Sequence, residues 1–201
     1  ENKVFYVSDE QAQSQYINMF KEEGMDAVYI VHNIDNPYIT HLESKNENVK
    51  FLRIDADLSD NFVGEALSEE LIKEYTDKLS EKFKKATGND KLNVKVENLK
   101  NENISSMLTL SEEQRRMIEM MKAYSMGGPM DMAMFGGEGE TLVLNASNKL
   151  VKYVLDNPEG EHADKICCQL YDLAVLANKP LSPEAMTAFV ARSNEILGLL
   201  I

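Results

Sequence analysis

Two aspartates, Asp55 and Asp57, directly follow an apolar stretch at residues 49–54 and form the clearest enzymatic motif in the sequence. An Asp-x-Asp pair after a buried strand can supply one carboxylate as a phosphoryl-accepting nucleophile and the other as an acid or base, with Mg²⁺ between them. So short a motif also arises by chance, and the same carboxylates can cap the turn that follows. The pair therefore indicates metal-assisted phosphoryl transfer as one hypothesis and a capped helix start as the other.

The first hypothesis corresponds to a magnesium-dependent phosphatase of the haloacid-dehalogenase type, with Ser59 in place of the usual threonine or valine. His162 and Cys168 offer a thiol with a nearby base, but Cys168 lies in an apolar stretch with helical periodicity, which favours burial. Cys167 and Cys168 point about 100° apart on a helix, so a disulfide between them would be strained. We interpret both as buried thiols in a reducing cytoplasm.

Methionine is the more informative residue type. Seven of the 11 methionines fall between residues 117 and 134. Met117, Met120, Met121 and Tyr124 share one face of an expected helix. Such a stripe is ordinarily core, yet flexible and polarizable methionine next to a glycine-rich loop also suits a surface that binds many apolar partners. Both interpretations stay open at this point.

These residues must be positioned by two different arrangements of helices and strands. Residues 1–60 alternate strand, helix, strand, helix and strand, which predicts a small parallel α/β unit. Its first helix should start at residues 8–10 and stop at Gly24, and its second strand, residues 27–31, should be buried on both faces. From residue 61 a mixed domain is expected, with a three-stranded sheet and several helices. The predicted class is thus α/β followed by α+β.

The second domain should contain a long helix over residues 61–86 that ends at Gly88, strands at 92–96, 104–110 and 142–144, and helices at 111–125, 149–156, 164–177 and 183–200. Pro183 after Ser182 suits a first helical position. The last two helices carry apolar stripes that need a partner surface, either inside the domain or on a second chain. Pairing with a second copy would give a four-helix bundle across a two-fold axis.

Charge and composition exclude several classes of partner. The 34 acidic against 21 basic residues give a formal net charge of −13, which disfavours nucleic acid and an anionic membrane surface. No apolar run approaches the roughly 20 residues that a membrane-spanning helix needs. The chain begins with Glu1 rather than methionine, so we expect a fragment of a longer, cytoplasmic protein.

Several stretches, taken together and in order, resemble the bacterial 90-kDa heat-shock protein (HtpG chaperone) family. They span residues 10–21, 24–28, 32–35, 134–137, 141–145, 169–174, 179–186 and 192–195. The resemblance implies that residues 1–58 are the end of a middle domain and residues 59–201 a carboxy-terminal dimerisation domain. It also implies that ATP and magnesium are bound upstream, so this fragment should hold no cofactor or metal and have no enzymatic activity of its own.

The resemblance further implies two kinds of partner, a second copy of the chain and unfolded or partly folded client proteins. The dimer interface would lie on the last two helices, and the residues we assign to it are Leu170, Leu173, Phe189, Ile196, Leu197 and Leu200. Client contact would fall on Met117, Met120, Met121 and Tyr124. A tryptophan that some relatives carry after Ile34 and Asp35, also implicated in client contact, is absent, and Pro37 and Tyr38 stand there. A purely structural dimerisation domain is the remaining alternative.

Overall fold

A computed structural model describes residues 2–32, 34–56, 62–65, 67–110 and 140–199. They divide into two compact units. The described part of the first unit is residues 2–32, 34–56, 62 and 109–110, and that of the second is residues 63–65, 67–108 and 140–199. The mixed α/β and α+β class predicted from the sequence is confirmed.

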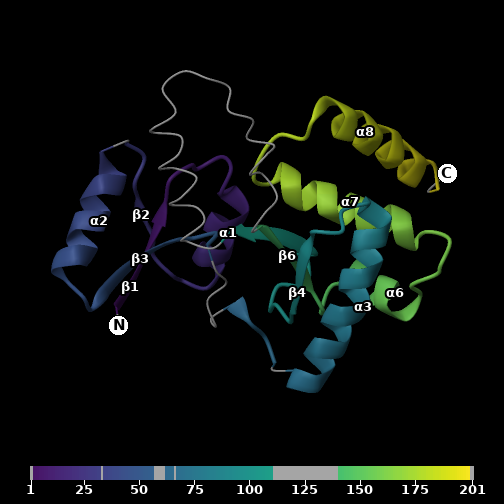
Figure 1. Ribbon diagram of the computed structural model, residues 1–201, viewed down its shortest axis with the longest axis horizontal. Coiled ribbons are helices and arrows are strands. Elements are labelled where there is room, and N and C mark those ends of the chain that lie inside the picture. Colours follow the sequence, from purple (N-terminus) through teal and green to yellow (C-terminus); the bar gives the residue numbers. More distant parts are fainter. Residues whose placement is uncertain (1, 33, 57–61, 66, 111–139, 200–201) are drawn as a thin grey trace. The chain divides into compact units, whose positions relative to one another are not determined.

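The described part of the first unit is a three-stranded parallel sheet with two helices. The backbone pairing gives its sheet the order β2-β1-β3, with β1 in the middle. These strands and α2 lie at the left of Figure 1. Both pairings are parallel, as the alternation of strands and helices predicts. The elements are β1 (Asn2–Val7), α1 (Ser14–Glu22), β2 (Val28–Tyr29), α2 (Asp35–Lys45) and β3 (Val49–Arg53).

Helix α1 starts later than the sequence predicts. Residues 8–13 form a turn in which the Gln13 side-chain oxygen accepts hydrogen bonds from the backbone N–H groups of Ser8 (2.8 Å) and Asp9 (3.0 Å). Helix α1 therefore begins at Ser14, after this turn, and the expected start at residues 8–10 is wrong. The expected stop is confirmed, because Gly24 follows the helix with φ +64°.

The prediction that residues 27–31 are buried on both faces is also wrong. Only Val28 and Tyr29 form β2, which lies at the edge of the sheet, and their exposed fractions are 46% and 54%. Burial instead falls on the central strand, where Tyr6 is 0% exposed and Val7 2%. A run of apolar residues does not reveal which strand is central, because that depends on the crossover connections.

The second unit is a three-stranded sheet covered by helices. Its sheet has the order β4-β6-β5, and β4 and β6 are parallel. The elements are α3 (Glu69–Thr87), β4 (Asn93–Glu97), β5 (Ser106–Leu110), β6 (Glu140–Asn145), α6 (Lys149–Asp156), α7 (Ala163–Leu176) and α8 (Pro183–Gly198). The first three residues of β5 belong to this unit.

Helix α3 begins at Glu69 rather than at residue 61. The hydroxyl of Ser68 accepts a hydrogen bond from the backbone N–H of Leu71 at 3.3 Å and so caps the helix. The predicted end is confirmed, because Gly88 adopts φ +67° directly after Thr87.

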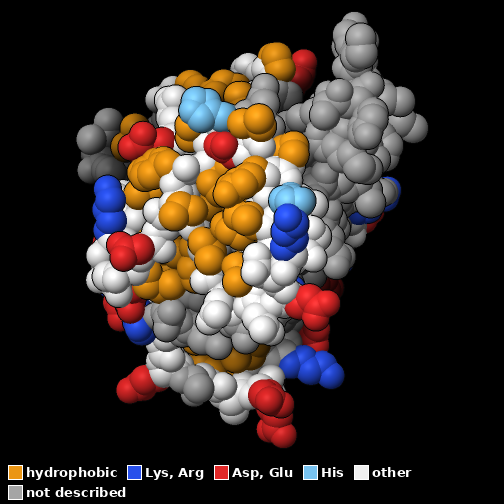
Figure 2. Space-filling view, turned by 90° about the vertical axis from the view of Figure 1, so that its left-hand side faces the viewer, with side chains coloured by type: hydrophobic (Ala, Val, Ile, Leu, Met, Phe, Trp, Pro, Cys, Tyr) orange, Lys and Arg blue, Asp and Glu red, His pale blue; other side chains and the backbone are white. Residues whose placement is uncertain are grey.

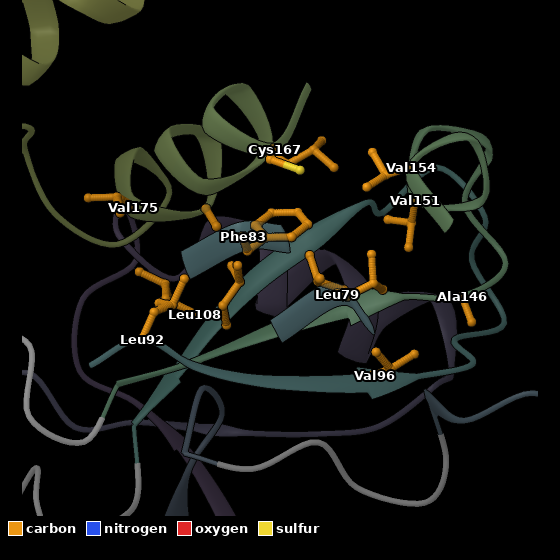
Figure 3. Packing of buried hydrophobic residues seen from close by; sticks show 14 residues of the cluster. Leu79, Phe83, Leu92, Val96, Leu108, Ala146, Val151, Val154, Cys167 and Val175 are labelled. Carbon is orange, nitrogen blue, oxygen red and sulfur yellow. The ribbon is translucent and has the colours of Figure 1, made fainter. Parts of the chain in front are cut away.

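The core of the second unit is built by α3, α6 and α7 packing on the sheet. Phe83 of α3 is fully buried and lies next to α7 near Cys167, while Val151 and Val154 of α6 lie on the other side of Leu79 (Figure 3). Val96, Leu142 and Leu144 of the sheet complete this cluster. None of the residues Pro183–Gly198 of α8 is buried. The last helix therefore lies outside the core.

Candidate functional site

Helix α8 carries apolar side chains on its outer surface. It begins where sequence chemistry predicts, with Pro183 in the first turn and the Ser182 hydroxyl accepting a hydrogen bond from the N–H of Ala185 at 3.2 Å. Met186, Val190 and Leu197 are 38%, 50% and 60% exposed. Their i, i+4 and i+11 spacing places them on one stripe. We call these three residues the α8 stripe.

Polar side chains hold α8 against α7 (Figure 1). The Arg192 guanidinium donates from Nε to Gln169 Oε1 at 2.8 Å and also forms an ion pair with Asp172. Gln169 Nε2 in turn donates to the Ser193 hydroxyl at 3.1 Å. The side chains of Arg192 and Asp172 are only 14% and 12% exposed. We call Arg192, Asp172, Gln169 and Ser193 the Arg192 network.

The residues assigned to the dimer interface fall into three environments. Leu173 and Leu197 are 44% and 60% exposed, so they are accessible to a partner. Phe189 and Ile196 are half-buried. Leu170 is 1% exposed within the core of the second unit, so its side chain is not part of the outer surface. Leu200 lies outside the described residues, and the interface itself stays a prediction.

The residues assigned to client contact lie outside the described residues. They are Met117, Met120, Met121 and Tyr124, and whether this stripe is core or surface stays open.

The Arg192 network was not predicted from the sequence. The signal available for it was Asp172 and Gln169, which lie three residues apart between apolar positions of a predicted helix.

The first unit has an apolar surface of its own. Several large apolar side chains are exposed on β2, on the residues after it and on α2. Figure 2 shows apolar side chains gathered on the side of the molecule where these elements lie. Its members are Val28 (46%), Tyr29 (54%), Val31 (57%), Ile34 (74%) and Tyr38 (59%). We call these five residues the β2–α2 patch. Such a clustered apolar surface is typical of an interaction site.

Of the two aspartates, Asp55 is described by the structure, and its carboxylate is paired with Arg53. Asp55 is 5% exposed, and both of its carboxylate oxygens accept hydrogen bonds from the Arg53 guanidinium, at 2.5 and 2.8 Å. This two-pronged ion pair orients the Asp55 carboxylate toward the neighbouring strand residue Arg53. Asp57 lies outside the described residues. Within the described ranges, no three His, Cys, Asp or Glu side chains are grouped as metal ligands.

The cysteines are unreactive by environment. Burial raises the pKa of the Cys167 thiol to about 12 and also raises that of Cys168, whose Sγ donates to the carbonyl of Ala86 at 3.1 Å. The thiolate is the nucleophilic form, so neither residue is suited to covalent catalysis. Cys167 is buried, as interpreted from the sequence, whereas Cys168 is half-buried. The helices of the described segments are also too short or too polar to cross a membrane.

A cavity of about 290 Å³ lies beside α3 and α6, lined by Leu79, Val154 and three lysines of α3 among others. Its most buried lysine, Lys82, is paired with Asp164 at 2.7 Å. That hydrogen bond raises the pKa of the Lys82 ammonium. Because its charge is already matched within the chain, this lysine does not mark a binding site for an anion.

Comparison with known proteins identifies the family of the chain. The model of the Hsp90 protein family matches residues 1–201, and the chain therefore belongs to the Hsp90 family. It is similar to the chaperone protein HtpG of Bacteroides thetaiotaomicron, with 30% identity over 162 residues that make up 77% of this chain and 23% of that protein. The chaperone protein htpG of Bacteroides fragilis strain 638R is 30% identical over 163 residues, or 78% of this chain and 23% of the relative. The resemblance to HtpG is thus confirmed, and the chain corresponds to about a quarter of these relatives.

Proposed function

We propose that this chain is part of an ATP-dependent molecular chaperone, in which it joins two copies of the protein and helps to bind unfolded or partly folded clients. The whole protein would bind ATP and magnesium outside these 201 residues. It would act in the cytoplasm. The observation that carries the dimerisation proposal is α8, a helix with no buried residue and an exposed apolar stripe. Such a surface gains stability by contact with a like surface across a two-fold axis.

In the proposed dimer, α7 and α8 of each copy form a four-helix bundle. The α8 stripe and Leu173 would be at its centre, because they are the large apolar side chains of these helices that a single chain leaves exposed. A stable association of this kind buries about 1,600 Å² in total.

Sedimentation velocity on the 201-residue chain tests this proposal. We expect a species of twice the 22.7 kDa chain mass, and Leu197→Asp should convert it to a monomer because a charge in an apolar interface is costly. Ala191→Asp is the matched control, since it adds the same charge to an exposed position about 120° around α8 from Leu197. A chain that stays monomeric at about 100 µM would contradict dimerisation.

Client binding is supported by the β2–α2 patch together with family membership. Unfolded chains expose apolar side chains of many shapes, and a broad apolar surface on a chain of net charge −13 binds them while the charge maintains solubility. The methionine stripe at residues 117–121 would add a second, adaptable apolar contact.

Fluorescence anisotropy with a labelled, reduced and carboxymethylated α-lactalbumin measures this binding. Replacing both Ile34 and Tyr38 by serine should weaken it by about fivefold or more, because two well-exposed apolar contacts are lost. Leu150→Ser is the control, since Leu150 is 46% exposed on α6 and outside the patch. Serine at Met117, Met120 and Met121 should weaken binding independently. If the patch variant binds like the unmodified chain, the patch is not a client site.

A further inference from the structure

Helix α8 is attached to α7 by hydrogen bonds between polar side chains, although the sequence shows apolar stripes on both helices. α8 has no fully buried residue, and its half-buried Phe189 and Ile196 are not among the side chains packed against the core of the unit. The Arg192 network supplies side-chain hydrogen bonds between α8 and α7 instead. Its two charged members are largely shielded from water, with side chains 14% and 12% exposed.

The geometry of the network is selective. Arg192 donates to Gln169 and to Asp172, which are three residues apart and hence neighbours on one face of α7. Ser193, the next residue of α8, accepts from the same Gln169 and donates to the Phe189 carbonyl at 2.7 Å. A guanidinium presents its donors in a rigid planar fork, so both acceptors are reached together in only one placement of α8.

Sliding or rotating α8 by one residue would break this arrangement. One residue corresponds to about 100° around a helix, which would remove Arg192 from both acceptors and leave Asp172 largely buried without its partner. The same rotation would carry the α8 stripe away from its outward direction. The network and the stripe are therefore coupled through the rotational setting of one helix.

We propose that Arg192 is the positioning residue of the dimer interface: through Asp172 and Gln169 it fixes the register of α8 on α7 and so determines which α8 side chains meet the second copy. This inference rests on the proposed dimerisation. An isologous interface needs the same surface on both copies, so a helix that sampled several settings would present it only part of the time. Shielded polar networks serve as such register devices in other helical assemblies.

A second ion pair provides an internal control. Lys165 and Glu195 also link α7 and α8, at 3.0 Å, but their side chains are 45% and 60% exposed. Pairs in such exposed positions contribute little, because water screens them and long side chains lose entropy in forming them. Lys165→Met therefore removes an ion pair between the same helices without removing the register device.

The experiment measures dimer dissociation by sedimentation, and amide hydrogen exchange across α8, in the 201-residue chain. Arg192→Met and Asp172→Asn should each weaken the dimer by about tenfold or more and speed exchange in α8, with α3 and β6 unchanged. Lys165→Met should stay within about twofold of the unmodified chain. The double variant Arg192→Met with Asp172→Asn should remain as weak as the single variants, because the register is still lost.

Two results would overturn the proposal. One is an Arg192→Met chain that dimerises normally and keeps slow exchange in α8. The other is a double variant that regains normal dimerisation, since the single variants would then report only an unpaired buried charge. If Arg192→Met does not fold, Arg192→Lys replaces it. Lysine keeps the charge for Asp172 but lacks the fork, so a threefold or greater weakening is expected and an unchanged dimer refutes the proposal. If the unmodified chain is monomeric, the proposed dimerisation is refuted. Amide hydrogen exchange in α8 then still tests whether Arg192 fixes the register of α8 on α7.

Discussion

Asn145, at the end of β6, should be among the costliest side chains to truncate in the second unit. It is 0% exposed, and its amide makes five hydrogen bonds. The side-chain oxygen accepts from the N–H of Leu99 at 3.0 Å, and the nitrogen donates to the carbonyls of Asn101 at 3.0 Å and Ile104 at 2.7 Å. Through them one side chain fixes the loop between β4 and β5 against the end of β6.

Asn145→Ala leaves two of these groups buried without a partner, the N–H of Leu99 and the carbonyl of Ile104. Each such group costs about 1–3 kcal/mol, while water can reach the partly buried carbonyl of Asn101 and the Ser147 groups. The free energy of unfolding of the second unit should therefore fall by about 2–6 kcal/mol. That is a large part of the roughly 5–15 kcal/mol that stabilises a typical domain.

Urea unfolding followed by far-UV circular dichroism measures this loss, with hydrogen exchange assigning it to the second unit. Asn157→Ala is the matched control, because its exposed amide donates a single bond of 3.2 Å to the Tyr153 carbonyl and its loss should change stability by no more than about 0.5 kcal/mol. A loss below about 1 kcal/mol for Asn145→Ala would refute the reasoning, since the freed groups would then have found other partners.

The remaining predictions concern the thiols and a helix end. At pH 8 Cys167 should react with iodoacetamide about 10³-fold more slowly in the folded chain than in urea, because a pKa of about 12 instead of 9.0 lowers its thiolate fraction by that factor. Equal rates would show that the thiol is not buried. Gly88→Ala should destabilise the second unit by about 1–2 kcal/mol in the same urea assay, since alanine resists φ +67° although no atom lies within 4 Å of an added Cβ. Gly198→Ala, at the end of α8 with equally open space, should be neutral or slightly stabilising.

The elements were predictable from the sequence where local chemistry decides them. Gly24 and Gly88 end helices because glycine adopts positive φ readily, and Ser182 with Pro183 starts α8 because a hydroxyl caps the free N–H groups there. The start of α3 had the same signal, the Ser68 hydroxyl before Glu69 and Glu70, but the apolar periodicity that reaches back to Phe62 placed the predicted start too early. The start of α1 was not predictable in this way. The Gln13 side chain bonds backward to the turn at Ser8, and a glutamine at this place leaves no distinct sequence pattern.

The candidate site was predictable only in part, because burial depends on the tertiary arrangement. Leu170 and Leu173 lie on the same apolar stretch of α7, yet one is 1% and the other 44% exposed. Helical spacing places both near one another but does not say which faces the sheet. The edge position of Val28 and Tyr29 and the pairing of Arg192 with Asp172 likewise join parts of the chain that sequence periodicity treats separately.

The side chains of the α8 stripe and of the β2–α2 patch are exposed in the single chain, so replacing them can alter binding without altering folding. α8 has no buried residue, and α2 has only Ile39, so the cores of both units are completed by other elements. Side chains such as Leu197 and Tyr38 are already hydrated in the single chain, and polar replacements there cost little stability. An effect of these replacements on association is then a direct measure of contact with a partner. A replacement in the core, such as Leu170→Ala, would instead cost about 2–5 kcal/mol and alter association only through unfolding.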